Sequence, residues 1–162
     1  MVKSSFGILM YRKAPGGVQV LLAHPGGPFW ARKHAGVWSI PKGEPEEGED
    51  PLGAARREFE EETGAAVTGQ FEDLGEIRQP SGKVVRVWAV EGDFDPAELV
   101  SSTFSMEWPP RSGTMREFPE VDRAAWFGVD EAREAIVRGQ AGFLDRLLAR
   151  LREEGSVTAG RA

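Results

Sequence analysis

The sequence has no cysteine among its 162 residues. Disulfides and thiolate metal sites are therefore excluded, and the simplest expectation for the compartment is the cytoplasm. No run of about 18 apolar residues occurs, so we expect no membrane-spanning helix and no membrane partner. The apolar stretch at residues 6–11 is short and soon followed by charge, which is not typical of a signal peptide.

Positive charge is also in the minority: the chain has 20 Lys and Arg residues and 26 Asp and Glu residues, which gives a net charge of −6. A surface that binds nucleic acid in general needs a basic face, so we expect no nucleic-acid partner. A small anionic ligand would need local basic residues or a metal ion. The hydrophobic fraction of 40% and the charged fraction of 28% are those of an ordinary globular chain.

The length and the absence of a repeat or linker predict one domain. We expect this domain to cover residues 1–152 and a flexible tail, EEGSVTAGRA, to occupy residues 153–162. Short apolar runs between Gly- and Pro-rich turns predict strands at residues 6–11, 18–23, 37–40, 71–77, 83–90 and 124–127. Helical spacing predicts helices at residues 130–137 and 140–151, whereas residues 93–123 show no clear pattern.

A further helix is framed by its capping residues. Asp50 is a good N-cap, Pro51 suits the first helical position, and Gly64 suits the residue after the last turn. These signals predict a helix of about 13 residues. Helices mixed with unequal hairpins predict an α/β layered domain with a mixed sheet.

Three glutamates on this helix are spaced so that they share one face. Glu58, Glu61 and Glu62 stand at positions i, i+3 and i+4, where unpaired like charges repel each other. Carboxylates clustered in this way suit a hard cation such as Mg²⁺ or Mn²⁺ bound together with phosphates. Arg57, four residues before Glu61, is placed to orient a carboxylate. The alternative is an acidic helix face that water simply solvates.

The segment from Gly43 to Ala65, here called the box segment, resembles the Nudix box, whose pattern is G-x5-E-x7-R-E-U-x-E-E-x-G-U with U bulky and apolar. The matching positions are Gly43, Glu49, Arg57, Glu58, Phe59, Glu61, Glu62, Gly64 and Ala65. Only Ala65 departs from the pattern, since it is small where the family has a larger apolar residue. The resemblance implies a Nudix α/β/α sandwich that hydrolyses a nucleoside diphosphate linked to another group.

The resemblance also implies roles for residues of the box segment. Its metal ligands would be the Gly43 carbonyl and the carboxylates of Glu58, Glu61 and Glu62, with Mg²⁺ as the ion and Mn²⁺ as a possible substitute. Arg57 and Glu49 would orient the helix and the loop before it. Glu58, Arg57 and Glu61 are the predicted catalytic residues, and Glu58 is the preferred general base.

A remote glutamate often joins the metal site in this family. Glu120 precedes the predicted strand at residues 124–127 and is the preferred candidate here, ahead of Glu107 and Glu117. An exposed loop acid is an equally good interpretation of Glu120.

Substrate contacts are expected from basic and aromatic residues upstream of the helix. Lys42 adjoins Gly43, and Arg32 and Lys33 lie in a Gly/Pro-rich loop, so each could meet a phosphate. Solubility alone would also explain each of these cations. Aromatic residues that could stack a nucleobase, or could simply pack, are Phe29, Trp30, Trp38 and Trp108; of these, Trp38 is the predicted substrate contact. His24 and His34 are expected to be structural.

The stretch WSIPKGE at residues 38–44 resembles the Nudix branch that includes diadenosine-polyphosphate hydrolases and NTP pyrophosphohydrolases. A small nucleotide is therefore the expected partner, with a dinucleoside polyphosphate or an NTP first in rank. Pro80 falls fifteen residues after Ala65, where ADP-ribose pyrophosphatases carry a proline, and this leaves ADP-ribose as the second choice. An oxidised NTP is a third choice. A nucleotide sensor without activity is the alternative of another class.

Overall fold

The structure is a computed structural model that describes residues 3–160, with side chains described through residue 155. Its strands are β1 (Ser4–Ala14), β2 (Gly17–Pro25), β3 (Lys42–Gly43), β4 (Glu72–Arg78), β5 (Val84–Glu91), β6 (Thr103–Glu107), β7 (Met115–Pro119) and β8 (Val121–Gly128). Its helices are α1 (Pro51–Thr63), α2 (Val129–Ala135) and α3 (Gly142–Gly160), with short 3₁₀ turns at Pro96–Glu98 and Arg138–Gln140.

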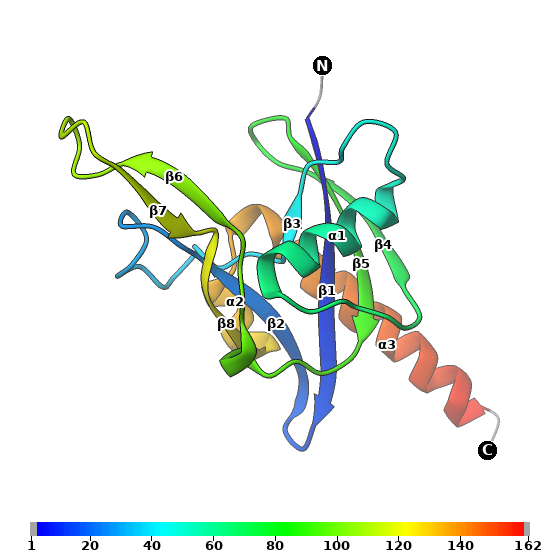
Figure 1. Cartoon of the computed structure of the whole chain (residues 1–162). Coiled ribbons are helices and arrows are strands. Elements are labelled where there is room, and N and C mark those ends of the chain that lie inside the picture. Colours follow the sequence, from blue (N-terminus) through cyan, green and yellow to red (C-terminus); the bar gives the residue numbers. More distant parts are fainter. Residues whose placement is uncertain (1–2, 161–162) are drawn as a thin grey trace.

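β1 lies at the centre of a six-stranded sheet in the order β4-β5-β1-β2-β8, with β3 attached to β1 beside this path (Figure 1). β1 pairs in parallel with β5 and antiparallel with β2 and β3, so the sheet is mixed, as predicted. β6 and β7 form a separate antiparallel hairpin that projects from the rest of the molecule (Figure 1).

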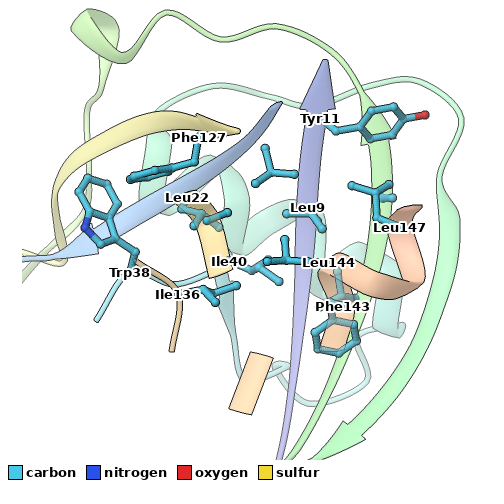
Figure 2. Close-up of a cluster of buried hydrophobic side chains, with 14 of the residues drawn as sticks. Leu9, Tyr11, Leu22, Trp38, Ile40, Phe127, Ile136, Phe143, Leu144 and Leu147 are labelled. Atoms are coloured by element: carbon cyan, nitrogen blue, oxygen red, sulfur yellow. The ribbon is translucent and has the colours of Figure 1, made fainter. Parts of the chain in front are cut away.

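Side chains alternate between the two faces of β1, and each face is covered by helices. Ile8 and Met10 pack in one buried cluster with Phe59 of α1. Leu9 and Tyr11 pack in a second cluster, drawn in Figure 2, which also takes apolar residues from α2 and α3. The alternation therefore buries both faces of the sheet, and the predicted α/β/α sandwich is confirmed.

The sheet opens between β1 and β2. The two strands pair only over Tyr11–Ala14 and Gly17–Val20, beside their connecting turn. Farther from the turn, the chain leading into β3 fills the gap: Ser39 forms a bridge with Ala23, and the N–H of Ile8 donates to the carbonyl of Pro41 over 3.1 Å. This inserted segment places the start of the box segment inside the sheet.

The strand predicted at residues 37–40 is wrong in its extent. Trp38 forms an isolated bridge with Ile136, and Ser39 forms one with Ala23. The segment therefore makes single contacts with two different partners and no continuous strand pairing. The paired strand comes later, at β3, where Gly43 lies opposite Phe6 of β1.

The helix of the box segment has its predicted bounds. The Asp50 carboxylate accepts from the N–H of Gly53 at 2.9 Å, and Pro51 occupies the first turn. Gly64 ends the helix with a φ of 85°, and its N–H donates to the carbonyl of Glu60 at 2.7 Å. A left-handed φ of this kind favours glycine, which explains the residue at this position.

The remaining elements differ from prediction mostly at their ends. The strands predicted at 71–77 and 83–90 are β4 and β5, and that at 124–127 belongs to the longer β8. α3 continues to Gly160, so helix occupies much of the predicted tail at 153–162; residues 161–162 and the side chains from 156 lie outside the described residues. No helix in the described part of the chain is long and apolar enough to cross a membrane.

Candidate active site

All hydrogen bonds of the Arg57 side chain are to residues of the box segment. An arginine side chain has five N–H donors. Nε and Nη2 form a two-pronged contact with Glu49 at 2.8 and 3.0 Å, and Nη2 also donates to the Glu44 carbonyl at 3.1 Å. Nη1 donates to Glu58 at 3.1 Å and to Glu61 at 3.0 Å. Because every donor already contacts a protein oxygen, this geometry favours an orienting role for Arg57 over a direct contact with substrate.

This network ties the loop before α1 to the helix. The hydrogen bond from Arg57 holds the pKa of Glu49 below its usual range, so Glu49 stays ionised. The Glu49 carboxylate also accepts a hydrogen bond from the backbone N–H of Glu46 at 3.0 Å. This contact joins two residues of the loop before α1. The orienting roles implied for Arg57 and Glu49 therefore have a direct structural counterpart.

Gly43 and Glu58 approach each other so closely that no side chain fits between them. A Cβ atom on Gly43 would overlap the Glu58 carboxylate. Burial raises the pKa of Glu58, the positive charge of Arg57 opposes this, and the negative charge of Glu61 adds to it. The glycine is thus needed to let the backbone of β3 reach the carboxylate.

Glu62 is the most strongly perturbed carboxylate of the helix. Burial, followed by repulsion from Glu58, raises the pKa of Glu62 to about 8. The positive charge of Lys42 and a hydrogen bond from its backbone N–H oppose this rise without cancelling it. A buried acid that resists ionisation beside other acids is typical of a site that takes up a cation.

Glu120 lies beside the glutamates of α1, although it is 58 residues away from Glu62 in the sequence. The two residues line one pocket of about 200 Å³, and the charge of Glu120 raises the pKa values of both Glu58 and Glu62. The rest of its lining comes from Ala23, Pro25, Ser39, Lys42 and Val121. Four elements of the chain therefore converge at this pocket.

Backbone hydrogen bonds fix Glu120 in this position. Its N–H donates to the carbonyl of Ser102 at 2.8 Å, and its carbonyl accepts from Gly26 at 2.9 Å. Ser102 in turn donates to the Glu61 carbonyl on α1 at 2.8 Å. The other two candidates lie on the hairpin: Glu107 accepts from the N–H of Arg111 at 2.7 Å, and Glu117 of β7 pairs with Ser105 of β6.

Lys42 contributes to the site through the charge of its ammonium and through its backbone N–H, both of which lower the pKa of Glu62. Consecutive residues of a strand face opposite sides of the sheet: Gly43 meets Glu58, whereas the Cβ of Lys42 lies near Gly7 on the α2/α3 side. Burial lowers the pKa of Lys42, and the neighbouring ammonium of Lys83 lowers it further. The charges of Glu62 and Glu58 act in the opposite direction, and Lys42 lines the pocket that holds Glu62, so its contact with phosphate stays a prediction.

The loop cations predicted to meet phosphate are at the surface. The ammonium of Lys33 lies 5.2 Å from the centre of the Trp30 ring. Arg32 is exposed and makes no hydrogen bond or ion pair with any side chain that the structure describes. Both remain free to move towards an anion.

Trp38 is a core residue and offers no surface to a nucleobase, so the structure does not support its predicted contact with substrate. Only 3% of it is exposed, and its ring packs edge-to-face against His24, His34 and Phe127. Its indole N–H donates to His34 at 3.1 Å. His24 is fully buried between Asp122 and the Lys33 carbonyl, each at 2.7 Å, which supports the expectation that both histidines are structural.

The carboxylates of α1 suit a divalent cation by their chemistry, though they do not yet converge on one point. Within the described residues, no three acidic or histidine side chains are already arranged around an ion position. Glu58 and Glu61 instead accept hydrogen bonds from the Arg57 guanidinium. The all-oxygen donor set and the mutual repulsion of Glu58, Glu62 and Glu120 fit a hard ion.

The raised pKa of Glu62 predicts a pH-dependent stability. Because the folded pKa of about 8 lies above the ordinary value of 4.5, stability is fully present below the ordinary value and is lost as pH rises towards 8. We expect urea denaturation with a chelator present to show the free energy of unfolding falling between pH 5 and 8. Each unit of pKa shift corresponds to about 1.4 kcal/mol. Glu62→Gln should flatten the curve, and Mg²⁺ should restore stability at the upper end. An unchanged slope in Glu62→Gln would contradict the assignment.

The chain is similar in sequence to known nucleotide hydrolases. The chain is 34% identical over 106 residues to an 8-oxo-(d)GTP phosphatase of Mycolicibacterium smegmatis, a match that covers 61% of this chain and 26% of that protein. The chain thus aligns with only about a quarter of the length of that relative. It is 29% identical over 153 residues to an RNA pyrophosphohydrolase of Caulobacter vibrioides, covering 82% of each.

Among solved structures, an Ap4A hydrolase of C. elegans superposes with a TM-score of 0.60 at 23% identity, covering 93% of this chain and 99% of the other. At this identity the likeness concerns the fold. The family model of the NUDIX domain matches residues 1–147, which include the whole box segment, Glu120, α1, α2 and the first third of α3. The chain therefore belongs to the NUDIX domain family.

Proposed function

We propose that this Nudix pyrophosphohydrolase cleaves a pyrophosphate linkage in a small nucleotide with the help of Mg²⁺, and that a dinucleoside polyphosphate or an NTP is its preferred substrate. The observation that carries the proposal is that Glu120 lines one pocket with Glu62 and lies close enough to Glu58 for its charge to raise the pKa values of both. The proposed compartment is the cytoplasm, on the ground that the sequence has no cysteine.

The proposed ligands of Mg²⁺, or of Mn²⁺ in its place, are the Gly43 carbonyl and the carboxylates of Glu58, Glu61, Glu62 and Glu120. A divalent ion at such a site neutralises pyrophosphate oxygens and lowers the pKa of a water molecule. The protein contributes the spacing: β3 presents Gly43 against Glu58, and the segment before β8 brings Glu120 to Glu62.

Glu58 is the proposed general base. Water attacks one phosphorus of the pyrophosphate and gives its proton to the Glu58 carboxylate, while the bond from that phosphorus to the bridging oxygen breaks and the second phosphate leaves with this oxygen. Burial raises the pKa of Glu58, which favours uptake of the proton. The contact with Arg57 at 3.1 Å keeps the carboxylate in place during the transfer.

The ranking of substrates rests on two local features. The segment at residues 38–44 resembles the diadenosine-polyphosphate and NTP branch of the family, and it forms the inserted strand at the site. Pro80, which motivates ADP-ribose as the alternative, lies in a tight turn where the N–H of Gly82 donates to the Gln79 carbonyl at 2.8 Å. Turn geometry is a sufficient reason for this proline, so ADP-ribose stays second.

A non-catalytic nucleotide sensor is the remaining alternative of another class. A sensor has no need of the full carboxylate set, whereas here all box carboxylates are present and Arg57 holds two of them. The complete set favours the enzyme.

The test is a panel of nucleotides with Mg²⁺, read by phosphate release and by the masses of products formed in heavy-oxygen water. We expect diadenosine tetraphosphate or an NTP to be cleaved fastest, with the label marking the attacked phosphorus. Faster cleavage of ADP-ribose would reverse the ranking. Tight nucleotide binding without product from any member of the panel would support the sensor.

A further inference from the structure

We propose that Phe29 and Trp108 form an aromatic platform that stacks a nucleobase of the substrate and so selects the group attached to the pyrophosphate. The proposal rests on the function proposed above and assigns specificity to two residues outside the box segment. Phe29 lies in the loop between β2 and β3, and Trp108 follows β6 at the tip of the hairpin.

The two rings meet across segments that are far apart in the sequence. Their centres lie 5.5 Å apart and their planes cross at 84°, an edge-to-face contact. Phe29 nevertheless remains 59% exposed, and Trp30 beside it is 41% exposed. Large aromatic side chains clustered at the surface are unusual in a folded chain and typically mark a binding site.

The platform adjoins the pocket of the glutamates. The N–H of Gly26 donates to the carbonyl of Glu120, and a Cβ on Gly26 would overlap the carbonyl of Pro119 at the end of β7. One residue later, Gly27 packs against the ring of Phe104 on β6. Figure 1 shows the loop after β2 running beside the β6–β7 hairpin. The platform thus begins three residues from a backbone contact of Glu120.

The size of the pocket requires such a neighbouring surface. Its volume is about 200 Å³, below the roughly 300–1,000 Å³ of pockets that enclose a whole small-molecule ligand. Phosphate groups can occupy it, and the organic part of a nucleotide must then lie outside, along the loop and the hairpin. Stacking on aromatic rings is a common means of holding a base without enclosing it.

The loop that carries Phe29 is fixed at both ends, and its charged residues are all positive. Gly26 anchors its start, and the fully buried His24 holds its far end by a contact of 2.7 Å with the Lys33 carbonyl. Residues 24–36 include two cations, Arg32 and Lys33, and no acid, in a chain whose net charge is −6. A surface that is basic and aromatic complements a polyphosphate that ends in a base.

The experiment compares the affinity of wild type and variants for ADP, by calorimetry, and for inorganic tripolyphosphate, which has no base. We expect Phe29→Ala and Trp108→Ala each to weaken ADP about 10-fold, the effect of losing one base–aromatic stack, and to leave tripolyphosphate unchanged. Phe29→Tyr should keep the affinity for ADP. Met115→Ala is the matched control, since Met115 lies on the same hairpin, is 64% exposed and has no ring.

Unchanged ADP affinity in folded Phe29→Ala and Trp108→Ala proteins would overturn the platform. An equal loss for tripolyphosphate would also overturn it, because the base would then not be what the rings recognise. A change of molecular mass in solution with unaltered ADP affinity would assign the rings to contact between copies of the chain instead. If wild type cleaves no nucleotide, the proposed function fails while the ADP measurement still decides the platform.

Discussion

Glu61→Gln is expected to lower kcat by about 1000-fold while the protein stays folded, because a carboxylate aimed at developing charge contributes an effect of this order. The side chain is 45% exposed, and its only hydrogen bond or ion pair in the described structure is with Arg57. Such an i, i+4 surface pair stabilises a helix by only about 0.5 kcal/mol. Removal of the negative charge also relieves repulsion of Glu58, so little stability is lost.

Glu60→Gln is the matched control for this measurement. Glu60 is the adjacent residue on the same helix and has the same side chain, but it lines a different pocket together with Arg56 and Val67. Turnover of the best nucleotide with saturating Mg²⁺ should be close to wild type in Glu60→Gln. Near-normal hydrolysis by a folded Glu61→Gln protein would count decisively against the site.

The sequence predicted the local part of the site well, for a physical reason. The bounds of α1 follow from Asp50, Pro51 and Gly64, whose capping preferences act within one helical turn. The spacing of glutamates on one face follows from the helical repeat once those bounds are known. Both inferences depend only on neighbours in the chain.

Features that depend on long-range pairing were harder to predict. Glu120 reaches the site because the segment at residues 100–102 pairs with the end of α1 and Gly26 pairs with Glu120. The β6–β7 hairpin occupies the stretch that showed no clear pattern, since none of its strand residues is buried and β7 is exposed at all but one position. Nothing in the sequence alone separates Glu120 from an ordinary loop acid.

Lys42 and Trp38, both in the stretch at residues 38–44, are predicted substrate contacts, and the directions of their side chains depend on the fold. Lys42 adjoins Gly43, yet strand alternation sends its side chain towards Gly7 on the opposite face. Trp38 opens the same motif, yet its bridge to Ile136 draws the indole into the core. Exposed aromatic residues, by contrast, were recognisable as candidates, and the contact between Phe29 and Trp108 required the fold.

Arg57→Ala is expected to lower both kcat and stability while leaving KM for the nucleotide nearly unchanged. All five donors of Arg57 contact protein oxygens, so the variant removes no substrate contact. Loss of a residue that orients ligands typically costs about 10–100-fold in activity. Glu49 and Glu58 would lose a charged partner, for which we expect a loss of about 2 kcal/mol in the free energy of unfolding.

Arg57→Lys separates charge from geometry in the same measurement. A lysine keeps the positive charge, but its single ammonium has three donors and cannot form the fork that holds Glu49 while it also reaches Glu58 and Glu61. We therefore expect Arg57→Lys to recover part of the stability and little of kcat. Arg56→Ala is the control, because Arg56 makes one hydrogen bond, to the Val67 carbonyl at 3.1 Å, and stacks on Phe71 away from the glutamates. A rise in KM with normal kcat in Arg57→Ala would show that the guanidinium binds substrate, and the positioning role would then be wrong.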